Sequence, residues 1–130
     1  MTHSTDPNIA IPRAVNGALN ALKASAKVPG LKRFVFTSSS FAATQPKPGK
    51  KFTITAESYN DEAVERAWKP NADGETVYSA SKVEAERAIF KWVKENKPSL
   101  IVNTGMNFSW LYAGCTDNAS PTQCQYRTNN

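Results

Sequence analysis

Val77-Tyr78-Ser79-Ala80-Ser81-Lys82 leads without a break into a run of helical periodicity at residues 83–90. Residues four apart lie on one face of a helix, so Tyr78 and Lys82 are expected to project side by side. A positive charge near a phenol favours the ionised form, which prepares the phenol to exchange a proton with a carbonyl or alcohol oxygen. The four-residue spacing alone also arises often by chance, as an exposed aromatic and a solvated lysine.

A second element lies upstream, at residues 33–40, with the sequence Arg-Phe-Val-Phe-Thr-Ser-Ser-Ser. This short run predicts a buried strand that delivers serines to its carboxyl end, where open α/β sheets bind their ligands. Because its residues alternate little, the strand is expected to be covered on both faces. A strand, serines and then a helix with Tyr and Lys form a much rarer order than the pair alone.

The whole chain reads as an α/β pattern of helix, strand, long loop, helix and strand. In chain order we predict a helix with its regular part beginning at Pro12, a strand at 33–37, a short strand at 52–55, helical turns at 61–67, a helix at 76–97 and a strand at 99–104. A strand, a helical crossover and a second apolar strand form a βαβ unit. The two strands should therefore be parallel and the crossover right-handed.

Residues 32–40 and 78–86 resemble the extended short-chain dehydrogenase/reductases of the NAD-dependent epimerase/dehydratase superfamily. The likeness is to the branch of dihydroflavonol-reductase-like and aldehyde or ketone reductases, and with the helix at 6–22 it covers roughly residues 6–104. It implies a partial Rossmann-like fold and an NADP or NAD cofactor. It also implies a small aldehyde, ketone or secondary alcohol as substrate.

The resemblance implies roles for three side chains. Ser39 would bind the substrate's carbonyl oxygen, and Tyr78 would act as the acid/base. Lys82 would tune Tyr78 and, together with it, contact the cofactor. The neighbouring serines are interpreted as turn residues, although the choice among the three could be off by one position. Residues 41–74 would help to frame the substrate pocket.

The resemblance does not extend beyond Gly105. We expect residues 1–106 to form a partial NAD(P)-binding Rossmann-like domain and residues 107–130 to form a divergent, disordered tail. A dinucleotide's pyrophosphate needs a glycine-rich turn, and the glycines form no such cluster. They are Gly17, Gly30, Gly49, Gly74, Gly105 and Gly114. NAD versus NADP therefore stays open, and the chain is interpreted as a fragment of a longer reductase.

Composition narrows the possible partners. The net charge of +5 comes from 16 basic residues scattered among 11 acidic ones, which indicates a solvated surface and no nucleic-acid partner. Two cysteines and one histidine argue against a metal site, and pairing of Cys115 with Cys124 stays open. No apolar run is long enough for a membrane span, and no secretory signal is seen, so a cytoplasmic location is expected. Unpaired strand edges predict association or poor solubility.

Three functional hypotheses remain. The first is an NAD(P)-dependent reductase or alcohol dehydrogenase acting on CH–OH groups. The second is an inactive, truncated remnant of such an enzyme that binds no cofactor of its own. The third is a basic binding module, which ranks last because basic and aromatic residues do not interleave in a reader motif. By descent we favour the first hypothesis. On the question of whether these 130 residues are active by themselves, we favour the second.

Overall fold

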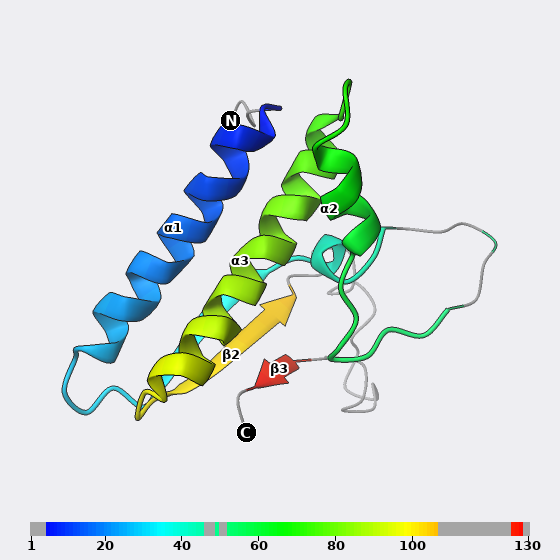
Figure 1. The fold of residues 1–130 in the computed structure, drawn as a ribbon. Helices are drawn as coiled ribbons and strands as arrows, with labels where there is room; N and C mark the ends of the chain where they lie inside the picture. Colours follow the sequence, from blue (N-terminus) through cyan, green and yellow to red (C-terminus); the bar gives the residue numbers. More distant parts are fainter. Residues whose placement is uncertain (1–4, 46–48, 50–51, 107–125, 129–130) are drawn as a thin grey trace.

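The structure is a computed structural model that describes residues 5–45, 49, 52–106 and 126–128. Its elements follow the predicted α/β order, with two additions (Figure 1). They are α1 (Pro7–Ala26), β1 (Arg33–Ser38), a short 3-10 helix η1 (Ser40–Ala42), α2 (Asp61–Ala67), α3 (Gly74–Asn96), β2 (Ile101–Met106) and β3 (Tyr126–Thr128). In the part of the chain that the structure describes, no helix is both long and apolar enough to cross a membrane.

The three strands form one sheet in the order β1-β2-β3. β1 and β2 are parallel, with Arg33 opposite Ile101 and Ser38 opposite Met106, which confirms the predicted βαβ unit. β3 runs antiparallel to β2 and was not predicted, because its three residues lie within the expected tail. The rest of that tail, residues 107–125 and 129–130, lies outside the described residues.

Helix α1 begins earlier than the sequence suggested. Asp6 caps it by accepting a hydrogen bond of 2.9 Å from the Asn8 backbone N–H, and Pro7 is the first helical residue. The expectation that the regular helix begins at Pro12 is wrong, because Pro12 lies inside the helix. Its missing N–H removes one backbone bond near the start, and the cap and the buried face of the helix outweigh that loss.

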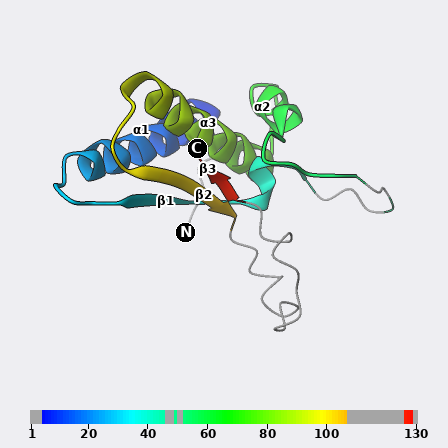
Figure 2. The same ribbon diagram turned by 90° about the horizontal axis from the view of Figure 1, so that it is seen from below.

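Helices α1 and α3 lie side by side on the same face of β1 and β2 (Figure 2). Burial along β1 consequently alternates, and Val35 on the opposite face is 62% exposed. Ile101 on β2 is also exposed. The expectation of a strand covered on both faces is therefore wrong for this chain. A strand alternates in burial whenever helices pack against only one of its faces.

The main core fills the space between the two long helices and the sheet. It contains Ala18 and Leu22 of α1, Ala85, Ile89 and Val93 of α3, Leu100 just before β2, and Val102 of β2. The stripe on α3 recurs at four-residue steps, as predicted, and continues the face that carries Tyr78 and Lys82. A second cluster packs the first turns of α3 against α1 and α2, with Ile11, Ala67, Val77 and Ala80.

Residues 52–55 do not form the short strand that their alternation suggested. Thr55 is part of a turn instead, in which its N–H donates to the Ser58 hydroxyl at 3.0 Å and its carbonyl accepts from the Ser58 N–H at 3.1 Å. A strand needs a neighbour to satisfy its backbone, and this segment pairs with none of the described strands. The helical turns predicted at 61–67 are confirmed as α2.

Candidate functional site

Tyr78 and Lys82 lie near the start of α3, one turn apart, as their spacing predicted. The ammonium nitrogen of Lys82 is 5.8 Å from the centroid of the Tyr78 ring and 5.3 Å from that of Phe36. It also donates a hydrogen bond of 3.2 Å to the carbonyl oxygen of Thr37, near the end of β1. Lys82 therefore connects the phenol of α3 to the carboxyl end of the strand.

Ser39 lies directly after β1, where it caps η1. Its hydroxyl accepts a hydrogen bond of 3.3 Å from the Phe41 N–H, which leaves the hydroxyl proton to be donated to another oxygen. The Phe41 ring meets the Tyr78 ring edge to face, with centroids 6.5 Å apart and an interplanar angle of 85°. Phe41 thus contacts both Ser39 and Tyr78. Ser39, Tyr78 and Lys82 therefore lie at the same end of the sheet.

Ser38 has a different environment from Ser39, which separates the two serines. Both serines are buried, but the Ser38 hydroxyl donates to a carboxylate oxygen of Glu86 on α3. The other oxygen of Glu86 accepts from the Thr104 hydroxyl of β2 at 3.3 Å. Ser38 is therefore occupied in a contact between elements, whereas Ser39 can offer its hydroxyl proton.

The sequence interpretation did not single out Glu86. Its signal was its spacing, because Tyr78, Lys82 and Glu86 recur at four-residue steps along one helical face. A carboxylate on a face that continues into buried Ala85 and Ile89 is unusual unless a partner satisfies it.

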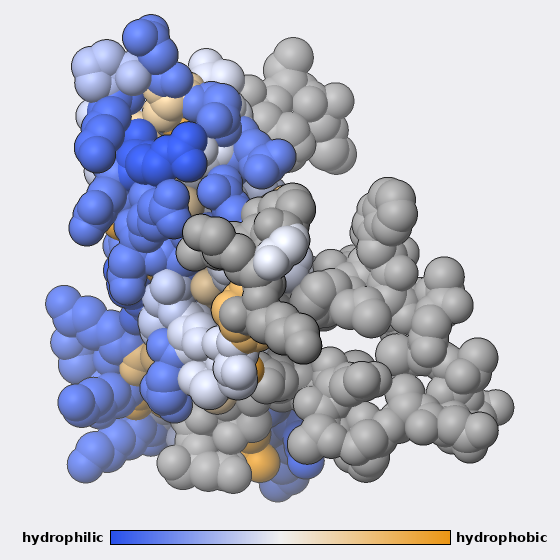
Figure 3. Space-filling model, turned by 90° about the vertical axis from the view of Figure 1, so that its right-hand side faces the viewer, coloured by the Kyte–Doolittle hydropathy of each residue, from blue (hydrophilic) through white to orange (hydrophobic). Residues whose placement is uncertain are grey.

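Arg87 ties the long connection between η1 and α3 to the helix that carries the site. Its guanidinium pairs with Asp61 at the start of α2 and with Glu84 at 3.3 Å, and it stacks over the Tyr59 ring at 4.8 Å. Desolvation lowers the pKa of Arg87, but the hydrogen bonds and charges of Asp61 and Glu84 outweigh it and raise that pKa. Figure 3 shows the face that lies on the right-hand side of Figure 1, where the coloured surface is mostly hydrophilic.

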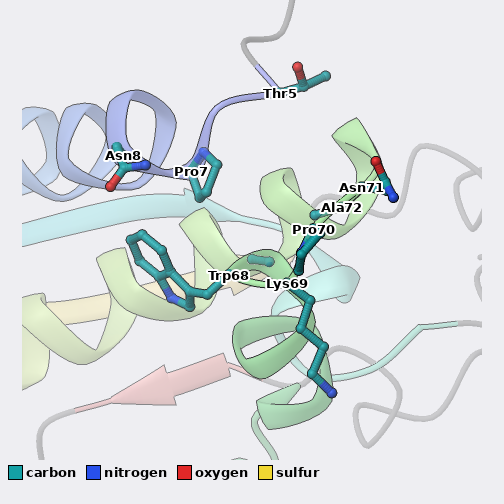
Figure 4. Close-up of a pocket in the computed structure, with 9 residues that line it drawn as sticks. Thr5, Pro7, Asn8, Trp68, Lys69, Pro70, Asn71 and Ala72 are labelled. Atoms are coloured by element: carbon teal, nitrogen blue, oxygen red, sulfur yellow. The ribbon is translucent and has the colours of Figure 1, made fainter.

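A cavity among the described residues lies away from this site. It has a volume of about 370 Å³ and lies between the start of α1 and the turn from α2 to α3 (Figure 4). Pro7, Asn8, Trp68 and Lys69 are among its lining residues, and Ser39, Tyr78 and Lys82 are not. The predicted site residues therefore gather at the strand end without lining this cavity.

No glycine-rich cradle for a pyrophosphate is formed by the described residues. Their glycines with positive φ, Gly30 and Gly49, lie in two separate turns. The described residues thus form no phosphate loop for a dinucleotide.

Comparison with known proteins gives the lineage. Residues 1–125 match the NAD-binding family model described as "Male sterility protein". The chain belongs to this NAD-binding family. Its relatives are reductases of the NAD-dependent epimerase/dehydratase type, which confirms the resemblance to the extended short-chain dehydrogenase/reductases.

Three curated fungal relatives illustrate the match. The NAD-dependent epimerase/dehydratase terH of Aspergillus terreus is 39% identical over 103 residues, which cover 76% of this chain and 30% of terH. Aldehyde reductase 2 of Sporidiobolus salmonicolor is 43% identical over 95 residues, or 69% of this chain and 28% of that protein. Ketoreductase adrE of Penicillium rubens is 43% identical over 102 residues, with coverages of 77% and 28%. The chain thus spans less than a third of the length of these relatives.

The fold has matches among solved structures. A chain described as "Structure-Guided Engineering of Reductase: Efficient Attenuating Substrate Inhibition in Asymmetric Catalysis" superimposes with a TM-score of 0.62 at 24% identity. A second, described as SsCR_L211H, gives a TM-score of 0.64 at 24% identity. Each match covers 80% of this chain and 32% of the other. These structures confirm the partial Rossmann-like fold.

The cap of α3, Asp73, is expected to make the stability of the fold depend on pH in acid. The Thr76 backbone N–H donates to its carboxylate at 2.7 Å and, with nearby Arg66, holds the pKa of Asp73 below the ordinary 3.8. A lowered folded pKa stabilises the fold above the unfolded value, and this contribution is lost as the pH falls through the folded pKa.

Asp73→Asn keeps a capping oxygen but does not titrate there. Between about pH 5 and about pH 2, the urea midpoint of this variant should fall less steeply than that of the wild type, as followed by circular dichroism. Equal slopes for the two proteins would show that the cap does not contribute to acid sensitivity.

Proposed function

We propose that this chain carries the proton-transfer residues for NAD(P)-dependent reduction of an aldehyde or ketone, or for oxidation of the corresponding secondary alcohol. The observation that carries the proposal is the Lys82 ammonium beside the Tyr78 ring, at the strand end that also holds Ser39. Relatives named aldehyde reductase and ketoreductase support the same reaction class.

The three side chains divide the work at the substrate oxygen. Ser39 donates a hydrogen bond to the carbonyl oxygen, where negative charge develops during reduction. Tyr78 gives its phenolic proton to that oxygen, and Lys82 stabilises the phenolate that remains. A nicotinamide cofactor held beside these residues would supply the hydride for the carbonyl carbon. Water then returns a proton to Tyr78.

Lys82 is also proposed to hold the nicotinamide ribose, together with Tyr78. An ammonium has three N–H donors, and the bond to the Thr37 carbonyl uses one, so two can reach ribose hydroxyls. Residues 1–106 would then act as part of an NAD(P)-binding domain. The choice between NAD and NADP is left to measurement, as is the chemical identity of the carbonyl substrate. We place the reaction in the cytoplasm, which supplies reduced nicotinamide.

The second candidate is a remnant that binds no cofactor by itself. Its specific support is the dispersal of the glycines, which leaves the described residues without a phosphate loop. The two candidates differ in one measurable property, which is the affinity of the purified chain for a reduced nicotinamide.

Fluorescence titration of the purified chain with NADH and NADPH separates the candidates. The reductase proposal expects saturable binding of at least one nucleotide and its oxidation in the presence of a panel of aldehydes and ketones. Binding of neither nucleotide would overturn the proposal for this chain and favour the remnant.

Tyr78→Phe tests the acid directly, because it removes only the phenolic hydroxyl. We expect the rate of carbonyl reduction to fall by about 10²- to 10⁴-fold with nucleotide affinity within a few-fold of the wild type. Tyr59→Phe is the matched control, since it removes a phenol that lies over Arg87 rather than beside Lys82, and should keep its rate. Equal rates for wild type and Tyr78→Phe would exclude Tyr78 as the proton donor.

We further propose that copies of the chain associate along the outer edge of β1. This strand lies at the end of the sheet order, and Val35 on its uncovered face is 62% exposed. Val35→Lys should therefore increase the monomer fraction seen by light scattering. Val28→Lys, at a position 54% exposed in the turn before β1, is the control. A wild-type chain that stays monomeric at high concentration would contradict this proposal.

A further inference from the structure

Glu86 is a buried carboxylate that the proposed reaction does not use. It is 2% exposed, and it lies two turns after Tyr78 on α3. A buried ionisable group is costly to keep unless hydrogen bonds satisfy it. Both Glu86 oxygens have such a bond, one from the Ser38 hydroxyl and one from the Thr104 hydroxyl.

The two donors come from neighbouring strands. Thr104 lies opposite Phe36 in the parallel register, two residues before the position of Ser38, so both hydroxyls lie on the sheet face that packs against the helices. One carboxylate therefore joins α3 to both β1 and β2. Hydrogen bonds are directional, so these two contacts restrict sliding of the helix along the strands.

We propose that Glu86 is a positioning residue that sets the distance between Ser39 and Tyr78. Ser38, which it holds, is the residue immediately before Ser39, and Tyr78 is on the same helical face as Glu86. The inference deepens the proposed reductase function and rests on it for its kinetic readout. This role differs from a general contribution to stability, because the bond to Ser38 and the bond to Thr104 have different consequences.

The bond from Glu86 to Ser38 on β1 holds the residue next to the serine that would bind substrate, whereas the bond to Thr104 on β2 holds no neighbour of a proposed site residue. Ser38→Ala removes the first bond. Thr104→Val removes the second and keeps nearly the same side-chain shape. Positioning predicts that Ser38→Ala lowers kcat for carbonyl reduction at least tenfold with an unchanged KM for the nicotinamide. Thr104→Val should keep kcat within about twofold, although both variants lose a bond to the same carboxylate.

Glu86→Gln provides the rescue. The glutamine side chain can still bond both hydroxyls, since each hydroxyl can donate or accept, and it should keep most of the kcat. Glu86→Leu, which can bond neither, should lose as much as Ser38→Ala. If kcat in this set simply follows the melting temperature, with Ser38→Ala and Thr104→Val equally impaired, the positioning role is wrong.

A spectroscopic readout separates this inference from the proposed function. 3-Fluorotyrosine placed at position 78 reports its surroundings through its ¹⁹F resonance, whether or not the chain is active. Ser38→Ala should shift or broaden this resonance, and Thr104→Val should leave it in place. An unchanged resonance in Ser38→Ala would overturn the positioning role even in an active chain, and the expected shift in an inactive chain would support it while the reductase proposal fails.

Discussion

Parallel pairing of β1 with β2 is the constraint on which the other features depend. Two parallel strands cannot be joined by a tight turn, so the chain must return across the sheet, and here it does so through α3. The crossover leaves from the carboxyl end of β1, and the first turns of α3 lie near that end. Tyr78 and Lys82, in the first turns of α3, are brought by this topology to the residues that follow β1.

Helix α3 combines three kinds of contact along one face. Its first turns carry the phenol and the ammonium, its middle carries the buried Glu86, and its last turns carry apolar side chains of the main core. Burial of the core side chains keeps α3 on the sheet. The hydrogen bonds to Thr37, Ser38 and Thr104 fix the orientation of α3 relative to the two strands. Chemistry and anchoring thus share one helix without competing for the same positions.

The sequence was most informative where structure is local. Tyr78 and Lys82 are set by helical periodicity, and α2 follows its own cap at Asn60, so both were predicted correctly. Glu86 was missed because its partners are 48 and 18 residues away and acquire meaning only in the fold. The exposed face of β1 was missed for a similar reason, since burial depends on which face both long helices cover. Pro12 lies inside α1 because the cap at Asp6 and the buried face of the helix outweigh one missing backbone bond.

The central claim is that α3 presents Tyr78 to the chain segment that follows β1. Nuclear Overhauser contacts between the Phe41 and Tyr78 rings in the isotopically labelled chain test it most directly, because the two rings are adjacent only if α3 and β1 have this arrangement. The account predicts cross-peaks between their ring protons. A well-dispersed spectrum with both rings assigned and no such cross-peaks would contradict it.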